Sequence, residues 1–202
     1  MTIVAVLAGG RGSRLGGAKP AAVLGGVPLV TRVLDAAAGL DAVVVAKRST
    51  ELPAVDVPVW VEPDALFHPW CGLVCALSRG TPVVAVACDQ PFVTGALLRA
   101  LVDAPEPAVP VVDGRREPFP GRYEPSQLSV LEAALAEEWS LRRTLAALAP
   151  APFDVSAFGD PARLVASVNT PAALAAAERE LAAAAASPRA PASPAPTTAR
   201  RP

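Results

Sequence analysis

A glycine-rich segment with basic side chains is the first feature of this sequence that could do chemistry. Residues 7–19 read LAGGRGSRLGGAK and follow an apolar run at residues 3–7. Glycine permits backbone conformations in which successive N–H groups converge on an anion. Arg11, Arg14 and Lys19 add positive charge to the same segment. The combination predicts a phosphate-binding loop of the kind that a triphosphate requires.

The loop fits neither of two familiar glycine motifs. A P-loop has a lysine directly after its last glycine, but Ala18 follows Gly17. A dinucleotide-binding fingerprint has a third glycine where Leu15 stands. The alternative is a tight connection between a strand and a helix, so the pattern favours phosphate binding without identifying the ligand.

A carboxylate follows a second apolar run, at residues 83–87, which leads into Cys88 and Asp89. A carboxylate just past a buried strand suits an anchor for Mg²⁺ held between protein and phosphate oxygens. The alternative role of Asp89 is a helix N-cap. Because magnesium prefers oxygen ligands, we interpret Cys88, like Cys71 and Cys75, as a core residue rather than a ligand.

The apolar pattern predicts the elements that position these residues. Strands are expected at residues 3–7, 42–46, 57–61, 83–87 and 109–112, and helices at 29–38, 71–77, 94–101, 126–138, 140–148 and 170–186, with serine starts at Ser126 and Ser140. Strands that alternate with helices indicate βαβ units and a mostly parallel sheet. Ligands bind such sheets at the C-terminal ends of strands, here just after Leu7 and Ala87.

Composition sets the remaining expectations. The chain has 202 residues, of which 52% are hydrophobic, and its net charge is -1, which favours one compact domain at residues 1–186 and gives no argument for nucleic acid binding. Residues 187–202 hold five prolines and three arginines, and we expect a disordered tail there. An odd number of cysteines and the lack of a basic segment before the short first apolar run predict a cytoplasmic protein without a membrane span.

The single histidine, His68, excludes mechanisms that need two imidazoles. It lies in a segment between an expected strand and an expected helix. We interpret it as a surface or packing residue rather than a catalytic base.

Several motifs together resemble the molybdenum cofactor guanylyltransferases and, more broadly, the nucleotidyltransferases built on a Rossmann-like sheet. They are the glycine loop, GGVPL at residues 25–29, CGL at 71–73, CDQPF at 88–92, SLRR at 140–143 and VNTP at 168–171. The resemblance covers residues 2–180. It implies an α/β fold with three layers and a mostly parallel central sheet.

The resemblance also implies an activity and a set of site residues. The family transfers GMP from GTP to the terminal phosphate of molybdopterin, releases pyrophosphate with Mg²⁺ as cofactor, and hands its product to molybdoenzymes. Carried over to this sequence, catalysis falls to Lys19, Asp89 and Arg14, and the metal to Asp89. The residues implied to bind nucleotide or pterin are Leu7, Ala8, Gly9, Gly10, Arg11, Lys19, Lys47, Asp64, Asp89 and Asn169.

Three departures from the family pattern keep alternatives open. The loop lacks the aspartate that usually precedes its lysine, Lys47 stands where an asparagine often contacts the base, and Ser167 replaces the first asparagine of the late motif. The first alternative is an enzyme that uses CTP with molybdopterin, or a sugar or alditol phosphate acceptor. The second is a nucleotide-binding module without turnover.

Overall fold

The strands that carry the expected chemistry form as predicted. The computed structural model describes residues 1–10, 15, 19–64 and 67–186. Strands β1 (Ile3–Leu7), β4 (Ala42–Ala46) and β6 (Val83–Ala87) match the predicted runs, β5 is shorter, at Val59–Val61, and β7 spans Ala108–Val112. The predicted tail, together with Arg11 and Arg14, lies outside the described residues.

These strands build one sheet in the order β10-β7-β9-β6-β1-β4-β5, with β8 (Arg115–Arg116) paired to β7. The pairs β1–β4, β1–β6, β4–β5 and β7–β10 are parallel, which confirms a mostly parallel sheet. Leu7 lies opposite both Val45 and Ala87, so β1, β4 and β6 end at one edge. Strand β9 (Gly121–Tyr123) runs antiparallel to β6 and β7 and was not predicted.

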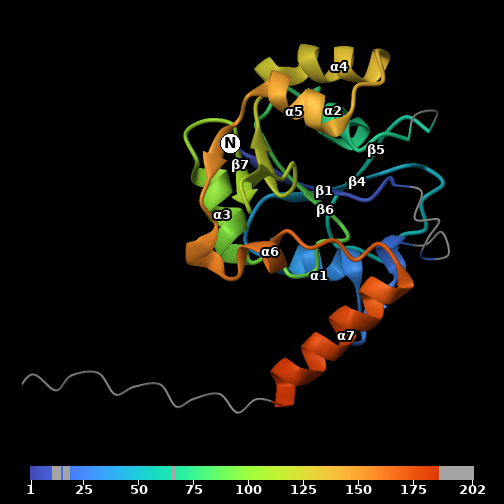
Figure 1. Cartoon of the computed structure of the whole chain (residues 1–202). Coiled ribbons are helices and arrows are strands. Elements are labelled where there is room, and N and C mark those ends of the chain that lie inside the picture. The colour runs from blue at the N-terminus through green and yellow to red at the C-terminus, as the bar shows by residue number, and fades with distance from the viewer. Residues whose placement is uncertain (11–14, 16–18, 65–66, 187–202) are drawn as a thin grey trace, which may run out of the picture.

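The helices cover both faces of the sheet (Figure 1). Helices α2 (Trp70–Leu77), α4 (Leu128–Ala136) and α5 (Leu141–Leu148) lie on one face, and α1 (Leu29–Ala36), α3 (Gly95–Asp103) and α6 (Pro161–Leu164) on the other. Each face has its own apolar core, because the buried valines of the strands point alternately to the two sides. The three-layer α/β architecture is therefore confirmed.

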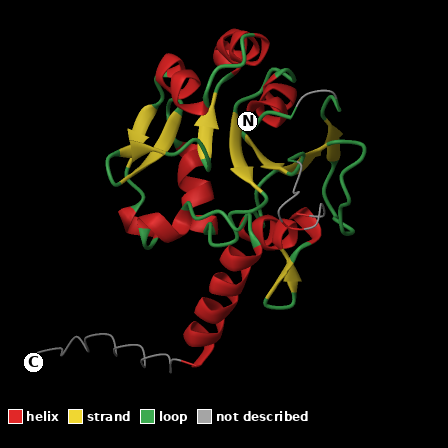
Figure 2. Ribbon diagram, turned by 45° about the vertical axis from the view of Figure 1, so that its right-hand side comes forward, coloured by secondary structure: helices red, strands yellow, loops and turns green. Residues whose placement is uncertain are grey.

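Helix α7 (Pro171–Ala186) projects from this body, as Figure 2 shows. It packs on the hairpin of β2 (Val23–Leu24) and β3 (Val27–Pro28), where Leu24, Val168 and Ala177 are buried together. In the described part of the chain, no helix combines the length and apolar character needed to cross a membrane.

Polar side chains cap three of the predicted helices, α3, α5 and α7. Thr94 accepts a hydrogen bond from the Leu97 N–H at 3.3 Å, and Thr170 accepts one from the Ala173 N–H at 3.1 Å. Ser140 caps α5 in the same way, as predicted. The expected start at Ser126 was wrong. Instead, Glu124 and Gln127 form a capping box around a 3₁₀ turn, and the α-helix begins at Leu128.

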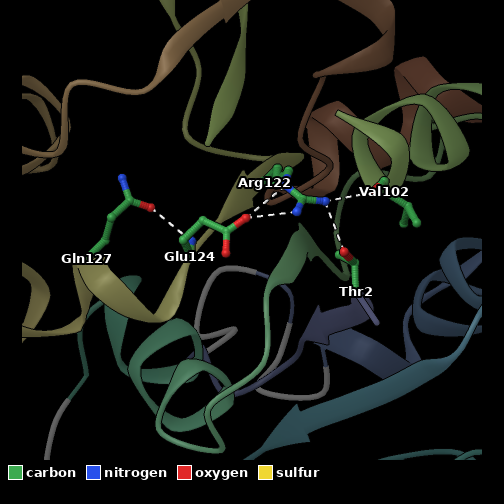
Figure 3. A network of polar contacts seen from close by, with 5 residues as sticks. All are labelled: Thr2, Val102, Arg122, Glu124 and Gln127. Atoms are coloured by element: carbon green, nitrogen blue, oxygen red, sulfur yellow. Dashed lines mark hydrogen bonds and ion pairs between the residues drawn. The ribbon is translucent and has the colours of Figure 1, made fainter. Parts of the chain in front are cut away.

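A polar network ties β9 to its neighbours (Figure 3). The guanidinium of Arg122 donates to Glu124 Oε1 at 2.8 and 3.2 Å, to Thr2 Oγ1 at 2.9 Å and to the Val102 carbonyl at 2.6 Å. Thr2 directly precedes β1, so this network lies at the N-terminal edge of the parallel strands. Arg122 is buried, and its contacts tie β9 to the residue before β1 and to the end of α3.

Candidate functional site

A cleft of about 680 Å³ opens at the C-terminal edge of the sheet. Its walls come from the segments that directly follow β1, β5 and β6, from the start of α2, from the turn before β9 and from the segment before α7. The described residues that line it include Leu7, Gly9, Gly10, Lys19, Glu62, His68, Gly72, Asp89, Gln90, Glu117, Ser167 and Asn169. Residues far apart in the sequence therefore meet at one edge.

Lys19 and Asp89 form an ion pair in this cleft. The Asp89 side chain is 6% exposed and the Lys19 side chain 20%. The Cys88 N–H donates to the Leu7 carbonyl at 3.0 Å, which continues the β1–β6 pairing and sets Asp89 beside the glycine loop. Asp89 is thus held by the sheet, while Lys19 reaches it from the far end of the loop.

Gln90 fixes the backbone around Asp89 and is a residue that the sequence analysis missed. Its Oε1 accepts the Ala87 N–H at 3.1 Å, and its Nε2 donates to the carbonyls of Phe119 at 2.6 Å and Val165 at 3.1 Å. One buried amide therefore joins three segments of the cleft wall. No sequence signal pointed to these partners, because they lie 29 and 75 residues away.

A second pair of opposite charges, Lys47 and Glu62, is buried beside the cleft. Their side chains are 2% and 4% exposed, and Nζ and Oε1 lie 3.5 Å apart. Glu62 lines the cleft, whereas Lys47 is not among the described lining residues and donates to the Pro63 carbonyl at 2.5 Å. Burial raises the pKa of Glu62 above its usual value, and the ammonium of Lys47 opposes that shift.

Sequence analysis also missed Glu62, although a signal for it existed. Glu62 directly follows β5, as Asp89 nearly directly follows β6. The rule that ligand-binding residues follow parallel strands applied to both positions. Asp64, which the family resemblance implied, is exposed and does not belong to the described lining of the cleft.

Two glycines make room for the Glu62 carboxylate. A Cβ atom at Gly9 would come within 1.5 Å of Oε1, and one at Gly72 within 3.2 Å of Oε2. Gly9 and Gly10 line the cleft as expected residues of the glycine loop. Ala8 is buried, and its N–H donates to the Val45 carbonyl at 2.8 Å, which extends the pairing of β1 with β4.

His68 lines the cleft, but both of its ring nitrogens have partners. Nδ1 accepts a hydrogen bond from the Trp70 N–H at 3.3 Å, and Nε2 lies 3.2 Å from the Trp139 carbonyl oxygen. The Trp139 carbonyl can only accept, so Nε2 is the donor in that contact. This geometry fits the packing role predicted for His68.

The late motif contributes Ser167 and Asn169 to the cleft. Thr170, not Asn169, caps α7, so the Asn169 side chain is not used as a helix cap. The Val168 N–H donates to the Asp89 carbonyl at 2.7 Å and joins this segment to the β6 loop. Asn169 therefore lies on the cleft wall that is tied to Asp89.

The three thiols are free, and Cys71 and Cys88 are buried as expected. Burial raises the pKa of Cys88 to about 12, so it stays a neutral thiol beside Asp89. Within the described ranges, no three His, Cys, Asp or Glu side chains group as a metal site. A metal in this cleft would depend on carboxylate and ligand oxygens.

A mostly parallel sheet whose C-terminal edge presents Gly9, Gly10, a lysine and a buried aspartate fits a nucleotidyltransferase. Comparison with known proteins agrees. Residues 4–153 match the model of the MobA-like NTP transferase domain family. The chain belongs to this family.

One relative supports the family assignment, and two solved structures share the fold. The chain is 33% identical over 185 residues to a molybdenum cofactor guanylyltransferase from Pseudomonas syringae pv. syringae, covering 83% of this chain and 89% of that protein. The fold resembles molybdopterin-guanine dinucleotide biosynthesis protein A from Archaeoglobus fulgidus, with a TM-score of 0.76, 24% identity, and coverage of 90% of this chain and 99% of that chain. It also resembles 2-C-methyl-D-erythritol 4-phosphate cytidylyltransferase from Thermus thermophilus, with a TM-score of 0.64, 17% identity, and coverage of 88% and 98%.

Proposed function

We propose that this nucleotidyltransferase transfers GMP from GTP to the terminal phosphate of molybdopterin and releases pyrophosphate. The observation that carries the proposal is the match to a guanylyltransferase at 33% identity over most of both chains. The cleft supports it, because Lys19 and Asp89 lie together beside the glycine loop. The structural neighbours under 25% identity support the fold only.

The reaction needs little from the protein beyond position and charge. A phosphate oxygen of the acceptor attacks the α-phosphorus, a new P–O bond forms, and the bond to the bridging oxygen of pyrophosphate breaks. The nucleophile is already anionic, so no strong general base is required, and the engaged ring nitrogens of His68 agree with this. The N–H groups of the loop and Lys19 hold the triphosphate in line for attack.

Asp89 is the residue that would hold Mg²⁺. A single buried carboxylate fits this ion, which keeps several waters and is bound by one or two carboxylates together with substrate phosphates. When bound, the ion neutralises charge on the reacting phosphates. Lys19 then moves its contact from Asp89 to phosphate oxygens, and Arg14 is proposed to neutralise the acceptor phosphate or the transition state.

Asn169 is proposed to bind the acceptor. It lines the cleft, it does not cap α7, and its neighbour Val168 is bonded to the Asp89 backbone. The backbone hydrogen bond between Val168 and Asp89 would therefore set the position of an acceptor held by Asn169 relative to Asp89. Ser167 on the same wall offers a hydroxyl to the same ligand.

The experiment that tests the function is pyrophosphate release with Mg²⁺ and molybdopterin, with GTP and CTP compared in parallel. Release with GTP and not with CTP is the expected result. Release with CTP alone would overturn the base assignment and keep the chemistry. Silence with both nucleotides would overturn the proposed transfer.

A further inference from the structure

The glycine pair of the GGVPL motif lies in a hairpin that the proposed reaction does not use. Strands β2 and β3 form a two-stranded sheet of their own, in which Leu24 pairs with Val27. Gly25 and Gly26 make the two-residue turn between them, with φ of 56° and 77°. A turn of this kind requires positive φ at both positions, which glycine adopts at little cost. Because the hairpin stands outside the main sheet, other elements must hold it in place.

One peptide group of this hairpin is held at both ends by charged side chains. Its carbonyl, that of Leu24, accepts a hydrogen bond from Arg32 Nε of α1 at 2.7 Å. Its N–H, that of Gly25, donates to Glu178 Oε1 of α7 at 2.8 Å. The approach is close, because a Cβ at Gly25 would lie 2.6 Å from Arg32 Nη2 and 3.2 Å from Leu181 Cδ1. Hydrogen bonds with a charged partner are the stronger kind, so two helices fix the hairpin through this one peptide group.

Lys19 is joined to this hairpin by a short segment with its own backbone hydrogen bonds. It begins a 3₁₀ turn, Lys19–Ala21, in which Pro20 is buried and its ring fixes the backbone φ. The Lys19 carbonyl accepts the Ala22 N–H at 3.2 Å, and the Ala22 carbonyl accepts the Leu29 N–H at 2.9 Å. The backbone at Lys19 therefore takes its position from the hairpin and from the start of α1.

The segment that leads into α7 is attached to the other member of the ion pair. In this segment, the Val168 N–H donates to the Asp89 carbonyl at 2.7 Å. Val168 and Ala177 are also buried together with Leu24, between α7 and the hairpin. One continuous stretch of chain thus contacts Asp89 first and then the hairpin that follows Lys19.

We propose that Glu178 is a positioning residue for Lys19. By holding the Gly25 N–H, its carboxylate fixes the hairpin against α7 and so sets the direction from which the Lys19 ammonium reaches the triphosphate. Glu178 is not among the described residues that line the cleft, so its action on a ligand is indirect. The inference rests on the contact between Lys19 and the triphosphate proposed above, and it adds a residue that acts through that contact.

The long side chain of Lys19 is the reason that its backbone must be fixed. A lysine ammonium stands on a flexible stem of four carbons, so a displaced backbone lets it meet a phosphate in many poor geometries. Groups held in place beforehand lose less freedom on binding, and a misplacement of about 1 Å is costly. An effect of Glu178 that operates through Lys19 must vanish when Lys19 is replaced. An effect on the stability of α7 alone would not vanish.

A double-mutant cycle on the full chain tests this dependence. Calorimetry measures the binding of GTP and of CTP with Mg²⁺, and the cycle uses whichever nucleotide binds more tightly. Glu178→Ala is expected to weaken binding about 3- to 10-fold, the range for one lost hydrogen bond. Lys19→Ala is expected to weaken binding about 10- to 100-fold, because it removes a charged partner of phosphate. In the Lys19→Ala background, Glu178→Ala should change the affinity less than about twofold.

The outcomes of the cycle separate this inference from the proposed function. Additive losses would overturn the positioning role of Glu178 and leave the role of Lys19 intact. An unchanged affinity in Lys19→Ala would overturn the proposed contact with the triphosphate, and the inference with it. The cycle needs no acceptor, so non-additive losses without any pyrophosphate release would sink the transfer reaction and leave the positioning role standing.

Two further variants distinguish the hydrogen bond from a general effect on α7. Glu178→Gln keeps a side-chain oxygen that can accept the Gly25 N–H, so it should bind nucleotide within about twofold of the wild type. The matched control is Glu180→Ala, which removes a carboxylate from the same helix that pairs with Arg163 and is 46% exposed. It should leave the affinity unchanged. An equal loss in Glu180→Ala, or no rescue by Glu178→Gln, would overturn the proposal.

Discussion

Two ion pairs lie at the cleft, and their lysines differ in exposure. Lys19 is 20% exposed beside Asp89, which is 6% exposed, and both side chains line the cleft. Lys47 and Glu62 are 2% and 4% exposed, and only the carboxylate of Glu62 lines the cleft. The first pair therefore suits the charge neutralisation proposed above, and the second is the more deeply buried of the two.

Removing either charge of the Lys19–Asp89 pair should reduce turnover and leave the fold intact. We expect Asp89→Asn and Lys19→Ala each to lower kcat/KM at least about 10²-fold, since one charge that stabilises a transition state contributes ~3 kcal/mol. Steady-state pyrophosphate release measures this. Asp41→Asn, an exposed change just before β4 at the opposite edge, is the matched control. Near-normal turnover of either site variant would contradict the assignment.

For the buried pair of Lys47 and Glu62, the prediction concerns stability rather than turnover. Lys47→Met alone should cost about 3–5 kcal/mol in the free energy of unfolding, because it leaves a buried carboxylate without its partner. The double variant Lys47→Met with Glu62→Met should recover most or all of that loss. Urea unfolding of the two variants and the wild type tests this. A double variant as unstable as the single one would mean that the pair is needed for folding.

The raised pKa of Glu62 predicts how this comparison depends on pH. A carboxyl group whose pKa is raised in the folded state binds a proton more tightly there than in the unfolded chain. Its stabilising contribution is thus present below the usual value of 4.5 and is lost as the pH rises through the raised pKa. The wild type should gain stability relative to the double variant as the pH falls through that window. Thermal unfolding of both proteins across this pH range measures the difference in stability. A wild type that loses stability relative to the double variant as the pH falls would contradict the prediction.

The sequence alone indicated some of these residues and not others. Lys19 and Asp89 were predicted, because a glycine loop and a strand-end carboxylate carry their own signals. Gln90 was missed because its role depends on partners brought close only by the fold. Glu62 was missed although it directly follows β5, where the rule for parallel strands applied. The position of Lys47 beside Glu62 could not be predicted from the sequence, since it depends on the pairing of β4 with β5.

At the scale of elements, the segment after β1 lies unusually close to the segment after β5. Gly9 has no space for a Cβ beside Glu62, whereas a Cβ at Gly10 would meet nothing within 4 Å. Gly9→Ala should therefore lower the free energy of unfolding by about 1–3 kcal/mol through overpacking, and Gly10→Ala should not. Thermal unfolding of the two variants provides a matched comparison. Equal effects would argue that loop conformation, not crowding, requires glycine here.

The Arg122 network should matter for stability and not for binding. It fastens β9 at the edge of the sheet opposite the cleft, with Glu124 still partly exposed at 24%. Arg122→Met should cost about 2–3 kcal/mol, less than a fully buried pair would, and leave the dissociation constant for GTP unchanged. Chemical unfolding and calorimetry together test this. A parallel loss of GTP affinity would show that β9 transmits strain to the cleft.

The lengths of the elements explain which of them could be predicted. Five-residue apolar runs such as β1, β4 and β6 carry a strong signal. Strands β8 and β9 have two and three residues and contain arginine, so they have no apolar run to detect. The start of α4 was also misplaced. Residues 126 and 127, which were predicted to begin the helix, belong to a 3₁₀ turn instead.

At the scale of the whole molecule, the two edges of the sheet carry different groups of polar residues. The cleft takes its residues from the C-terminal edge, and the Arg122 network lies at the N-terminal edge. The fold class followed from the alternation of strands and helices. The order of the strands did not, because β9 enters between β6 and β7 against their direction and only tertiary contacts select that position.

The ion pair of Lys19 and Asp89 also sets how the ligands influence one another. Each of these side chains must leave the other before it can serve a ligand. When Lys19 turns to a triphosphate, the Asp89 carboxylate is released, and the reverse exchange releases Lys19. With Asp89 holding the cation and Lys19 the triphosphate, as proposed, we expect nucleotide and divalent cation to bind cooperatively, and linkage makes the gain in affinity the same in both directions. The expected consequence is a preference for the metal–nucleotide complex over either component alone.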